Sequence, residues 1–301
     1  MARIRVDSDA SGQRVDHLVA AALPDLSVAA ARRLIAGGAV RVDGRLAKKG
    51  EHLTAGQTVE VDEASLAPSG AEARRVRPDP RLPIAILRVD PSFVAVEKPA
   101  GVPSHPRAAG ELGTAANAIV ARFPECAAAS PDPREGGLVH RLDTGTSGVL
   151  LAARNAAVWP LLRAALSRPG CEKTYLAEVR GSPPDAGEAS APIGRVGRRG
   201  ARVRVDGGRN PLPAHTTWEA IARRPDTTVV RVRLHKGRAH QVRAHLAAAG
   251  YPIVGDSLYG DGGAESLQLH LHAESVRFPH PESGALILIE SAPPTWAKLG
   301  E

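Results

Sequence analysis

A proline-rich stretch divides the 301 residues of the chain into two unequal parts. Prolines and a glycine stand among charged residues at Pro68, Gly70, Pro78, Pro80 and Pro83. This composition is typical of a linker between domains, and a chain of this length usually forms about two domains. We therefore expect a small domain over residues 1–64, a linker over residues 65–83 and a large domain over residues 84–301.

The small part has the periodicities of an α+β unit. Apolar residues recur at helical spacing over residues 15–19 and 31–35, and Ser27 is a suitable N-cap for the second helix. Valines at 40 and 42 then alternate with a polar residue, and Asp43-Gly44 is typical of a two-residue hairpin turn. A closing strand is expected over residues 59–61.

The large part mixes strands and helices without regular alternation, which argues against a doubly wound parallel sheet. We expect an α+β fold with a mixed, largely antiparallel sheet flanked by helices. Strands are predicted over residues 84–89, 93–96, 149–151, 174–179, 201–205 and 228–235. Helices are predicted over residues 114–122 and 239–249, and residues 194–200 are interpreted as a glycine-rich basic loop.

The net charge of +7 favours a polyanionic partner such as RNA. The excess is uneven: residues 1–64 are neutral, with nine basic and nine acidic side chains, whereas residues 194–209 hold six arginines and one aspartate. We expect Arg198, Arg199 and Arg202 in this segment to contact RNA phosphates. An alternative is that 33 arginines against 6 lysines reflect a coding bias rather than RNA binding.

Several protein classes are excluded by pattern. No apolar run reaches the roughly 18 residues of a membrane span, and the charged N-terminus is unlike a secretory signal. Cys126 and Cys171 lack metal-binding spacing, and His240 and His245 are five apart, which is off the spacing of helical ligand pairs. No nucleotide-binding glycine loop is present. We expect a cytoplasmic protein with reduced thiols, no metal, no cofactor and no membrane partner.

The most distinctive stretch is a polar loop that precedes an apolar strand. It reads His140-Arg141-Leu142-Asp143-Thr144-Gly145-Thr146-Ser147-Gly148. A loop rich in Gly, Ser and Thr can hold a side chain in fixed geometry at the mouth of a cleft. An aspartate flanked by an arginine and hydroxyls can serve as nucleophile, base or metal ligand. The alternative is a turn in which Asp143 accepts backbone N–H bonds.

A basic stretch over residues 235–246 leads into a predicted helix. Arg243 lies one turn into this helix, three residues after His240. An arginine there can pair with a carboxylate from elsewhere in the chain and keep it ionised. Arg238 is the second candidate for this pairing, because spacing does not separate the two. The alternative is a solvated basic helix face.

Five segments resemble, in order, the motifs of the RluA-type pseudouridine synthases, a family of RNA-modifying isomerases. The loop around Asp143 is similar to the central signature of that family. The other four segments are residues 89–106, 173–181, 237–260 and 269–281. Residues 12–62 resemble the S4 RNA-binding domain, which often precedes this catalytic domain.

The resemblance implies roles for several residues. Asp143 is the catalytic aspartate, Tyr175 stacks on the everted uracil or takes its C5 proton, and Arg243 pairs with Asp143. Arg141 fills the space vacated by the everted nucleotide or contacts its phosphate. We further expect His140 and Arg238 to contact the RNA. For Tyr175 the alternative is a tyrosine of the hydrophobic core.

The predicted function is therefore isomerisation of uridine to pseudouridine in a structured RNA by a monomeric enzyme. Large-subunit ribosomal RNA is favoured as the substrate, because relatives with an S4 domain commonly act there, and transfer RNA is the alternative. A non-catalytic RNA-binding protein of the same fold is a less favoured reading. An unrelated hydrolase with Asp143 as its nucleophile is another.

Overall fold

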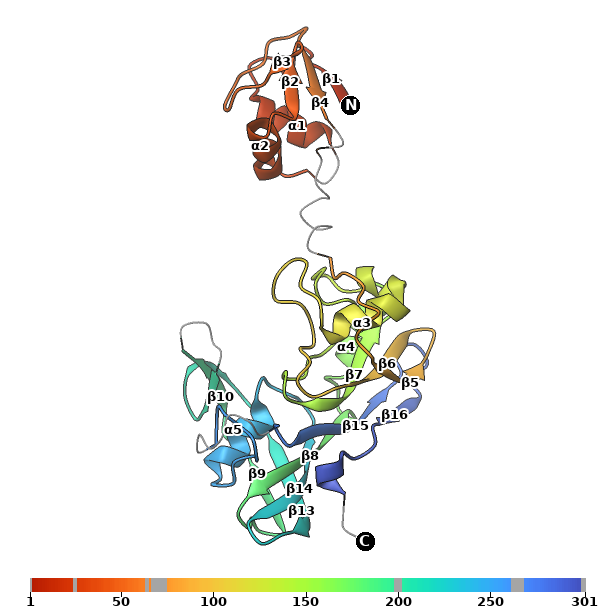
Figure 1. The fold of residues 1–301 in the computed structure, drawn as a ribbon, viewed down its shortest axis with the longest axis vertical. Coiled ribbons are helices and arrows are strands. Elements are labelled where there is room, and N and C mark those ends of the chain that lie inside the picture. Colours follow the sequence, from red (N-terminus) through yellow and green to blue (C-terminus); the bar gives the residue numbers. More distant parts are fainter. Residues whose placement is uncertain are drawn as a thin grey trace. The chain divides into compact units, whose positions relative to one another are not determined.

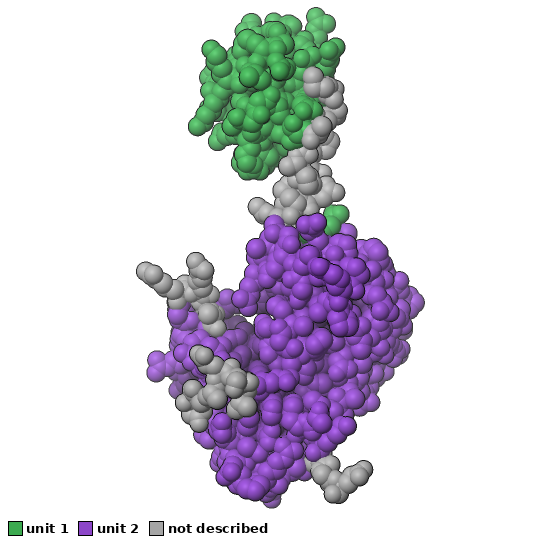
Figure 2. Space-filling model, viewed as in Figure 1, with its two compact units in different colours: residues 1–75 green, residues 76–301 purple. Residues whose placement is uncertain are grey.

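The chain forms two compact units, residues 1–75 and residues 76–301 (Figure 2). The computed structural model describes residues 2–23, 26–62, 65, 75–197, 202–260 and 268–298. No helix among these residues has the length and apolarity needed to cross a bilayer.

The boundary between the units lies inside the predicted linker. Val76 is buried in the core of the larger unit, and its N–H donates to the Pro133 carbonyl at 2.8 Å. Asp79 is also buried, and its N–H donates to the Asn117 carbonyl at 3.1 Å. The linker prediction is thus too long at its C-terminal end. Proline favours an extended backbone, and such a backbone can lie along a domain surface as well as between domains.

In the smaller unit two helices pack on a four-stranded antiparallel sheet of order β1-β4-β2-β3. Its elements are β1 Ala2–Arg5, α1 Val15–Ala22, α2 Val28–Ala36, β2 Val40–Val42, β3 Arg45–Leu46 and β4 Thr58–Val61. The Ser27 hydroxyl caps α2 by accepting the Ala30 N–H at 3.2 Å, as predicted. Asp43 and Gly44 have φ of 49° and 78°, which the predicted hairpin turn requires.

The larger unit is built on a nine-stranded sheet (Figure 1). Its order is β5-β6-β7-β15-β8-β14-β13-β9, with β16 paired to β15. The strands are β5 Ala85–Val89, β6 Phe93–Lys98, β7 Ser147–Ala153, β8 Glu172–Arg180, β9 Ala186–Ala189, β13 Thr216–Arg223, β14 Thr227–Leu234, β15 Leu271–Pro279 and β16 Leu286–Glu290. The helices are α3 Ala115–Arg122, α4 Val158–Ala165 and α5 Gln241–Ala248, with 3-10 turns at Pro124–Ala128 and Thr295–Ala297.

The pairings of this sheet confirm the predicted α+β class with a mixed, largely antiparallel sheet. Neighbouring strands are antiparallel except β7 and β15, which run parallel and are joined through Ser147 with His272 and Gly148 with Ala273. A Cβ on Gly148 would lie 2.2 Å from the Ala273 carbonyl oxygen. Only glycine therefore permits this parallel junction.

A separate three-stranded antiparallel sheet has the order β11-β10-β12. Its strands are β10 Ile193–Val196, β11 Arg202–Val205 and β12 Arg209–Leu212. The loop predicted over residues 194–200 is wrong in its first part, because β10 begins at Ile193. A Cβ on Gly194 would lie 2.2 Å from the Gly207 carbonyl oxygen, so glycine here permits close backbone approach within a strand.

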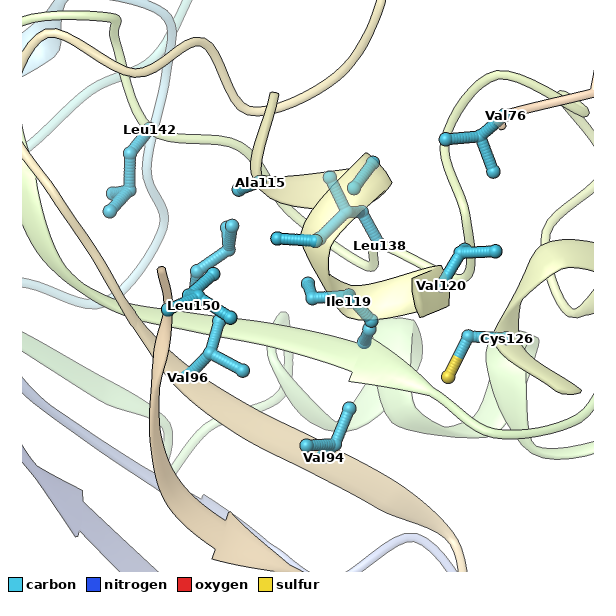
Figure 3. Packing of buried hydrophobic residues seen from close by; sticks show 14 of the residues in the cluster. Val76, Val94, Val96, Ala115, Ile119, Val120, Cys126, Leu138, Leu142 and Leu150 are labelled. Atoms are coloured by element: carbon cyan, nitrogen blue, oxygen red, sulfur yellow. The ribbon is translucent and has the colours of Figure 1, made fainter. Parts of the chain in front are cut away.

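Strand β6 is buried on both faces, which explains its unbroken run of apolar residues. Successive side chains of a strand point to opposite faces. Val94 and Val96 accordingly pack with α3, whereas Phe93 and Ala95 pack with α4. Figure 3 shows the α3 side, where Ile119 lies among the valines. Each buried side chain of this size stabilises the fold by roughly 1.5–3 kcal/mol, so β6 and its neighbour β7 are firmly placed.

Helix α5 is held against the other half of the sheet. Val242 and Leu246 pack with Val230 and Val232 of β14. Gly250, at φ 90°, comes directly after residue 249, where the predicted helix ends. β7, β15 and β8 are consecutive in the sheet, so the loop that precedes β7 lies close to β8. A hydrogen bond from Arg243, in the first turn of α5, to Asp143 places the start of α5 beside the same loop.

Candidate active site

Asp143 lies in the loop before β7 and lines two cavities of about 370 Å³ and 970 Å³. The backbone on either side of it is fixed. The Ser104 hydroxyl donates to the Leu142 carbonyl at 2.7 Å and accepts the Leu142 N–H at 3.0 Å, and the Gly101 N–H donates to the Thr144 carbonyl at 2.8 Å. Among the described residues no backbone N–H donates to the Asp143 carboxylate, so the simple turn alternative does not describe this side chain.

A buried lysine adds a third tie to this loop. Lys98 is fully buried, and its Nζ donates to the carbonyls of Pro99, Val102 and Thr144 at 2.8, 2.6 and 3.1 Å. Burial lowers the pKa of Lys98 to about 8, and the negative charge of Asp143 opposes that shift. The ammonium therefore holds the segment after β6 against the Asp143 loop.

Arg243, rather than Arg238, forms the predicted ion pair with Asp143. Its Nη1 donates to Asp143 Oδ2 at 2.7 Å. Its Nε and Nη2 donate to the two carboxylate oxygens of Asp256 at 2.8 and 2.7 Å. Burial disfavours the charged guanidinium, but the hydrogen bonds to Asp256 and Asp143 outweigh burial and raise the pKa of Arg243. Arg238 lines the smaller cavity and donates to the Pro213 carbonyl at 3.3 Å.

Asp256 is a buried counter-ion for which the sequence suggested no role. Its side chain is 0% exposed, and its Oδ1 also accepts the N–H groups of Leu258 and Tyr259 at 2.9 and 3.1 Å. Burial alone would raise the pKa of Asp256, but its bonds to Arg243 and to the backbone lower it. Asp256 thereby holds the Nε and Nη2 atoms of the Arg243 guanidinium, and Nη1 remains to donate to Asp143.

Tyr175, half-buried on β8, lines the smaller cavity. Its ring also packs against two apolar clusters. Tyr175 therefore lines the cavity, as expected of a site residue, and also packs with the hydrophobic core, as the alternative expected. Burial and the charge of Asp143 raise the pKa of the Tyr175 phenol, which donates to none of the described residues. Lys173, two residues earlier on the same strand face, also lines the cavity, and burial lowers its pKa. Sequence reasoning assigned no role to Lys173.

Arg141 is exposed and lines both cavities, where it contacts a histidine. The Nδ1–H of His105 donates to the Pro106 carbonyl at 2.9 Å, because a carbonyl oxygen can only accept. Nε2 of the neutral ring is then an acceptor, and Arg141 Nη1 donates to it at 3.1 Å. His105 thus orients the guanidinium at the cavity.

His140 also lines the smaller cavity, but its ring is tied to the protein. Nε2 accepts the Leu151 N–H at 3.2 Å, and burial lowers the pKa of His140 to about 3. The ring is therefore neutral and braces the loop against β7. An RNA contact by His140 stays a prediction.

The arginines predicted to bind phosphates are placed only in part. Arg198 and Arg199 lie outside the described residues. Arg202 of β11 is exposed, donates to the Leu258 carbonyl and stands 5.9 Å from the Tyr259 ring centre. Sequence reasoning missed further cavity arginines: Arg107 and Arg163, which belong to no charge run, and Arg195, which lies in the basic segment 194–209 but was not singled out there.

In the parts of the chain that the structure describes, no cluster of three or more His, Cys, Asp or Glu side chains could hold a metal ion. The residues around Asp143 are instead cations and hydrogen-bond donors. An ionised carboxylate, a phenol and several guanidiniums around one small cavity suit a substrate that carries phosphates and a polar base.

Comparison with known families decides the relationship. Residues 92–248 match the family described as RNA pseudouridylate synthase, and residues 13–59 match the S4 domain. The chain belongs to the RNA pseudouridylate synthase family. It is accordingly an RNA pseudouridine synthase, an isomerase, and the predicted family resemblance is confirmed, as is the S4 domain near the N-terminus.

Individual relatives of this pseudouridine synthase agree. Ribosomal large subunit pseudouridine synthase D of Xanthomonas campestris pv. campestris is 34% identical over 294 residues, which is 93% of this chain and 85% of that protein. An uncharacterized RNA pseudouridine synthase of Chloroflexus aurantiacus is 35% identical over 281 residues, with coverages of 91% and 84%. Among solved structures, human RNA pseudouridylate synthase domain containing 1 covers 70% of this chain and 83% of its own, at 25% identity and a TM-score of 0.57.

Proposed function

We propose that this pseudouridine synthase acts on large-subunit ribosomal RNA and that Asp143 is its catalytic carboxylate. The observation that carries the assignment is the Asp143–Arg243 ion pair, 2.7 Å long, in a cavity that Arg141 and Tyr175 also line. The choice of RNA rests on relatives named ribosomal large subunit pseudouridine synthase D, at 30–34% identity.

The isomerisation fits a single carboxylate. The C1′–N1 bond of uridine breaks with its electron pair on the uracil, the detached base turns, and C5 bonds to C1′. The proton on C5 leaves and a proton is taken up at N1, so no oxidant or reductant is consumed. A carboxylate beside the ribose can attack C1′ or stabilise a cationic sugar. Both roles need a counter-ion beside the carboxylate, and Arg243 supplies it at 2.7 Å.

The cavity is suited to one everted nucleotide. Its volume of about 370 Å³ is within the range of small-molecule pockets, and eversion from a stacked RNA costs a few kcal/mol. Arg141, oriented by His105, is our candidate for the side chain that fills the vacated stack or holds the flanking phosphate. The Tyr175 phenol is our candidate for contact with the base.

The larger cavity supports an RNA path beside the site. Arg107, Arg141 and Arg195 line it, and each guanidinium can pair with a phosphate. Phosphate contacts position an RNA without reading its sequence. Recognition of a particular uridine therefore depends on the shape of the RNA as well as on the cavity.

The central test is Asp143→Asn in the full chain. With RNA carrying tritium at uridine C5, we expect tritium release to fall by at least about a thousandfold, because the reacting carboxylate is lost. RNA binding, measured by filter retention, should be unchanged. Asp185→Asn is the matched control: Asp185 pairs with Arg223 at 2.6 Å and lines neither cavity. Retained turnover in Asp143→Asn contradicts the assignment.

The choice of RNA is tested separately. Purified chain is incubated with large-subunit ribosomal RNA and with bulk transfer RNA, and the pseudouridines formed are mapped. We expect new pseudouridines in the ribosomal RNA. Modification confined to transfer RNA overturns the proposed substrate and leaves the role of Asp143 standing.

A further inference from the structure

His240 lies between the catalytic loop and a tyrosine that follows α5. It is the N-cap of α5 and has a left-handed backbone, with φ of 54°. Its Nδ1 is 2.9 Å from the Tyr259 hydroxyl, and its Nε2 is 3.7 Å from Asp143 Oδ1. Nothing in the sequence analysis gave His240 a part in the reaction.

The proton positions follow from the donors around Tyr259. The Val203 N–H of β11 points at the Tyr259 hydroxyl oxygen at 2.8 Å, and a backbone N–H can only donate. The hydroxyl therefore accepts from Val203 and has one proton left to donate. Among the described residues its other polar partner is His240 Nδ1, and donation to that nitrogen is the arrangement that gives the hydroxyl proton an acceptor. A neutral imidazole that accepts at Nδ1 carries its hydrogen on Nε2.

We propose that Tyr259 fixes His240 in the Nε2–H tautomer, so that His240 is a second donor to Asp143, on the oxygen that Arg243 leaves open. Arg243 takes Oδ2, whereas His240 faces Oδ1. The inference rests on the proposed role of Asp143. The 3.7 Å separation is longer than a hydrogen bond, and catalytic contacts of this kind shorten when substrate binds.

The opposite tautomer would reverse the effect on Asp143. With hydrogen on Nδ1, the Nε2 lone pair would face the carboxylate oxygen, and two electron-rich atoms would repel each other. The Tyr259 hydroxyl would then accept from both Val203 and His240, and its own proton would have no acceptor among the described residues. The hydroxyl of Tyr259 thus decides whether His240 stabilises or repels the ionised carboxylate, which makes Tyr259 a positioning residue.

The charges around the ring agree with a neutral His240. Among the described residues, the charged and titratable groups that interact with the ring are Asp143, Arg243, Asp256 and Tyr259. Burial lowers the pKa of His240 below its ordinary value, and the negative charge of Asp143 opposes burial only in part. At neutral pH the ring therefore has a single proton to place.

The decisive experiment reads the tautomer without turnover. The full chain is labelled with ¹⁵N-histidine, and its ring nitrogens are recorded by long-range ¹H–¹⁵N correlation, with His240→Gln to assign the residue. We expect a pyrrole-type Nε2 and a pyridine-type Nδ1. Tyr259→Phe, which keeps the ring over Arg243 but loses the hydroxyl, should convert His240 to a mixture or to the Nδ1–H form. An Nδ1–H ring in the native chain, or no change in Tyr259→Phe, overturns the proposal.

Kinetics supply a second readout. Loss of one oriented hydrogen bond is worth roughly a factor of ten, so Tyr259→Phe should lower kcat about tenfold with KM unchanged. Tyr251→Phe is the matched control, because Tyr251 lines neither cavity. Glutamine has no tautomers, so adding Tyr259→Phe to His240→Gln should not lower kcat further. If the two substitutions instead lower kcat independently, Tyr259 does not act through His240.

The two proposals fail in different ways. If Asp143→Asn stays active while the tautomer is as expected, the proposed function falls and the histidine geometry stands. If Asp143→Asn is inactive but the native tautomer is Nδ1–H, only the role of Tyr259 is lost.

Discussion

Each of the two units has a buried cluster of aspartate and arginine side chains, but the two clusters contain them in opposite proportions. In the smaller unit Asp16 accepts hydrogen bonds from two guanidiniums, Arg14 at 2.9 Å and Arg32 at 2.6 Å. In the larger unit Arg243 lies between two carboxylates, Asp143 and Asp256. One cluster has an excess of positive charge and the other an excess of negative charge.

In each cluster, the solvent-exposed side chain is of the charge type that is in excess. The Arg14 and Arg32 side chains are 37% and 49% exposed while Asp16 is 1% exposed. Asp143 is 26% exposed while Asp256 is fully buried. The smaller unit thus exposes fixed cations although its residues 1–64 carry no net charge, and the larger unit exposes one fixed anion. A buried counter-ion orients the exposed group in both.

The largest expected effect comes from removing the shared arginine. Arg243→Met leaves Asp256 buried without a cation, and breaking such a pair destabilises a fold by about 3–5 kcal/mol. We expect this loss in urea unfolding of the larger unit, together with loss of turnover. Arg223→Met, at the exposed pair with Asp185, should change stability by less than about 0.5 kcal/mol. Equal effects of the two changes would remove the distinction between buried and exposed pairs.

A second prediction concerns Lys98, a buried cation that contacts carbonyls rather than a carboxylate. The pKa of Lys98 is about 8 in the fold against an ordinary 10.5. Below pH 8 both folded and unfolded chains are protonated, and burial of the charge penalises the fold. Between these values the folded chain gives up its proton first, so its contribution to stability rises with pH, by on the order of 3 kcal/mol.

Unfolding free energies of the native chain and of Lys98→Met at pH 7.5 and pH 10 check this sign. The native chain should gain stability relative to the variant as the pH rises. A relative gain toward low pH would mean that Lys98 is held charged by an anion, as the two aspartate clusters hold their arginines.

The smallest expected effect concerns RNA binding by the fixed cations of the smaller unit. Arg32→Gln should lower the slope of log binding constant against log salt by about one, because one oriented phosphate contact is lost. Arg33→Gln is the control: it changes the same net charge on the same helix, and no contact with Asp16 holds Arg33. An equal change in both variants would show that net charge, rather than orientation by Asp16, sets the affinity.

Local patterns predicted much of the fold. The Ser27 cap, the Asp43-Gly44 turn and the doubly buried strand β6 each depend on neighbours within a few residues, and the sequence shows these directly. Strand β10 was missed because Gly194 there serves a close approach of Gly207, a partner that no local pattern reveals.

The site was predicted less completely, for a related reason. Asp143 stands in a distinctive loop, and resemblance pointed to it. Its partner Arg243 is 100 residues away, so spacing alone did not separate Arg243 from Arg238, the second candidate. Asp256 and Tyr259 lie in a matched segment but gain their roles only from burial and donor direction, which depend on the assembled fold.

The parallel pairing of β7 and β15 has a consequence for folding during translation. Asp143 precedes β7, Tyr175 is on β8, and strand β15 alone pairs with both β7 and β8 among the described strands. A chain still being translated has already made its S4 domain, its aspartate and its arginine before residues 271–279 leave the ribosome. Until that late strand inserts, β7 and β8 lack the strand that joins them, so we expect Asp143 and Tyr175 to come together only after β15 has been made.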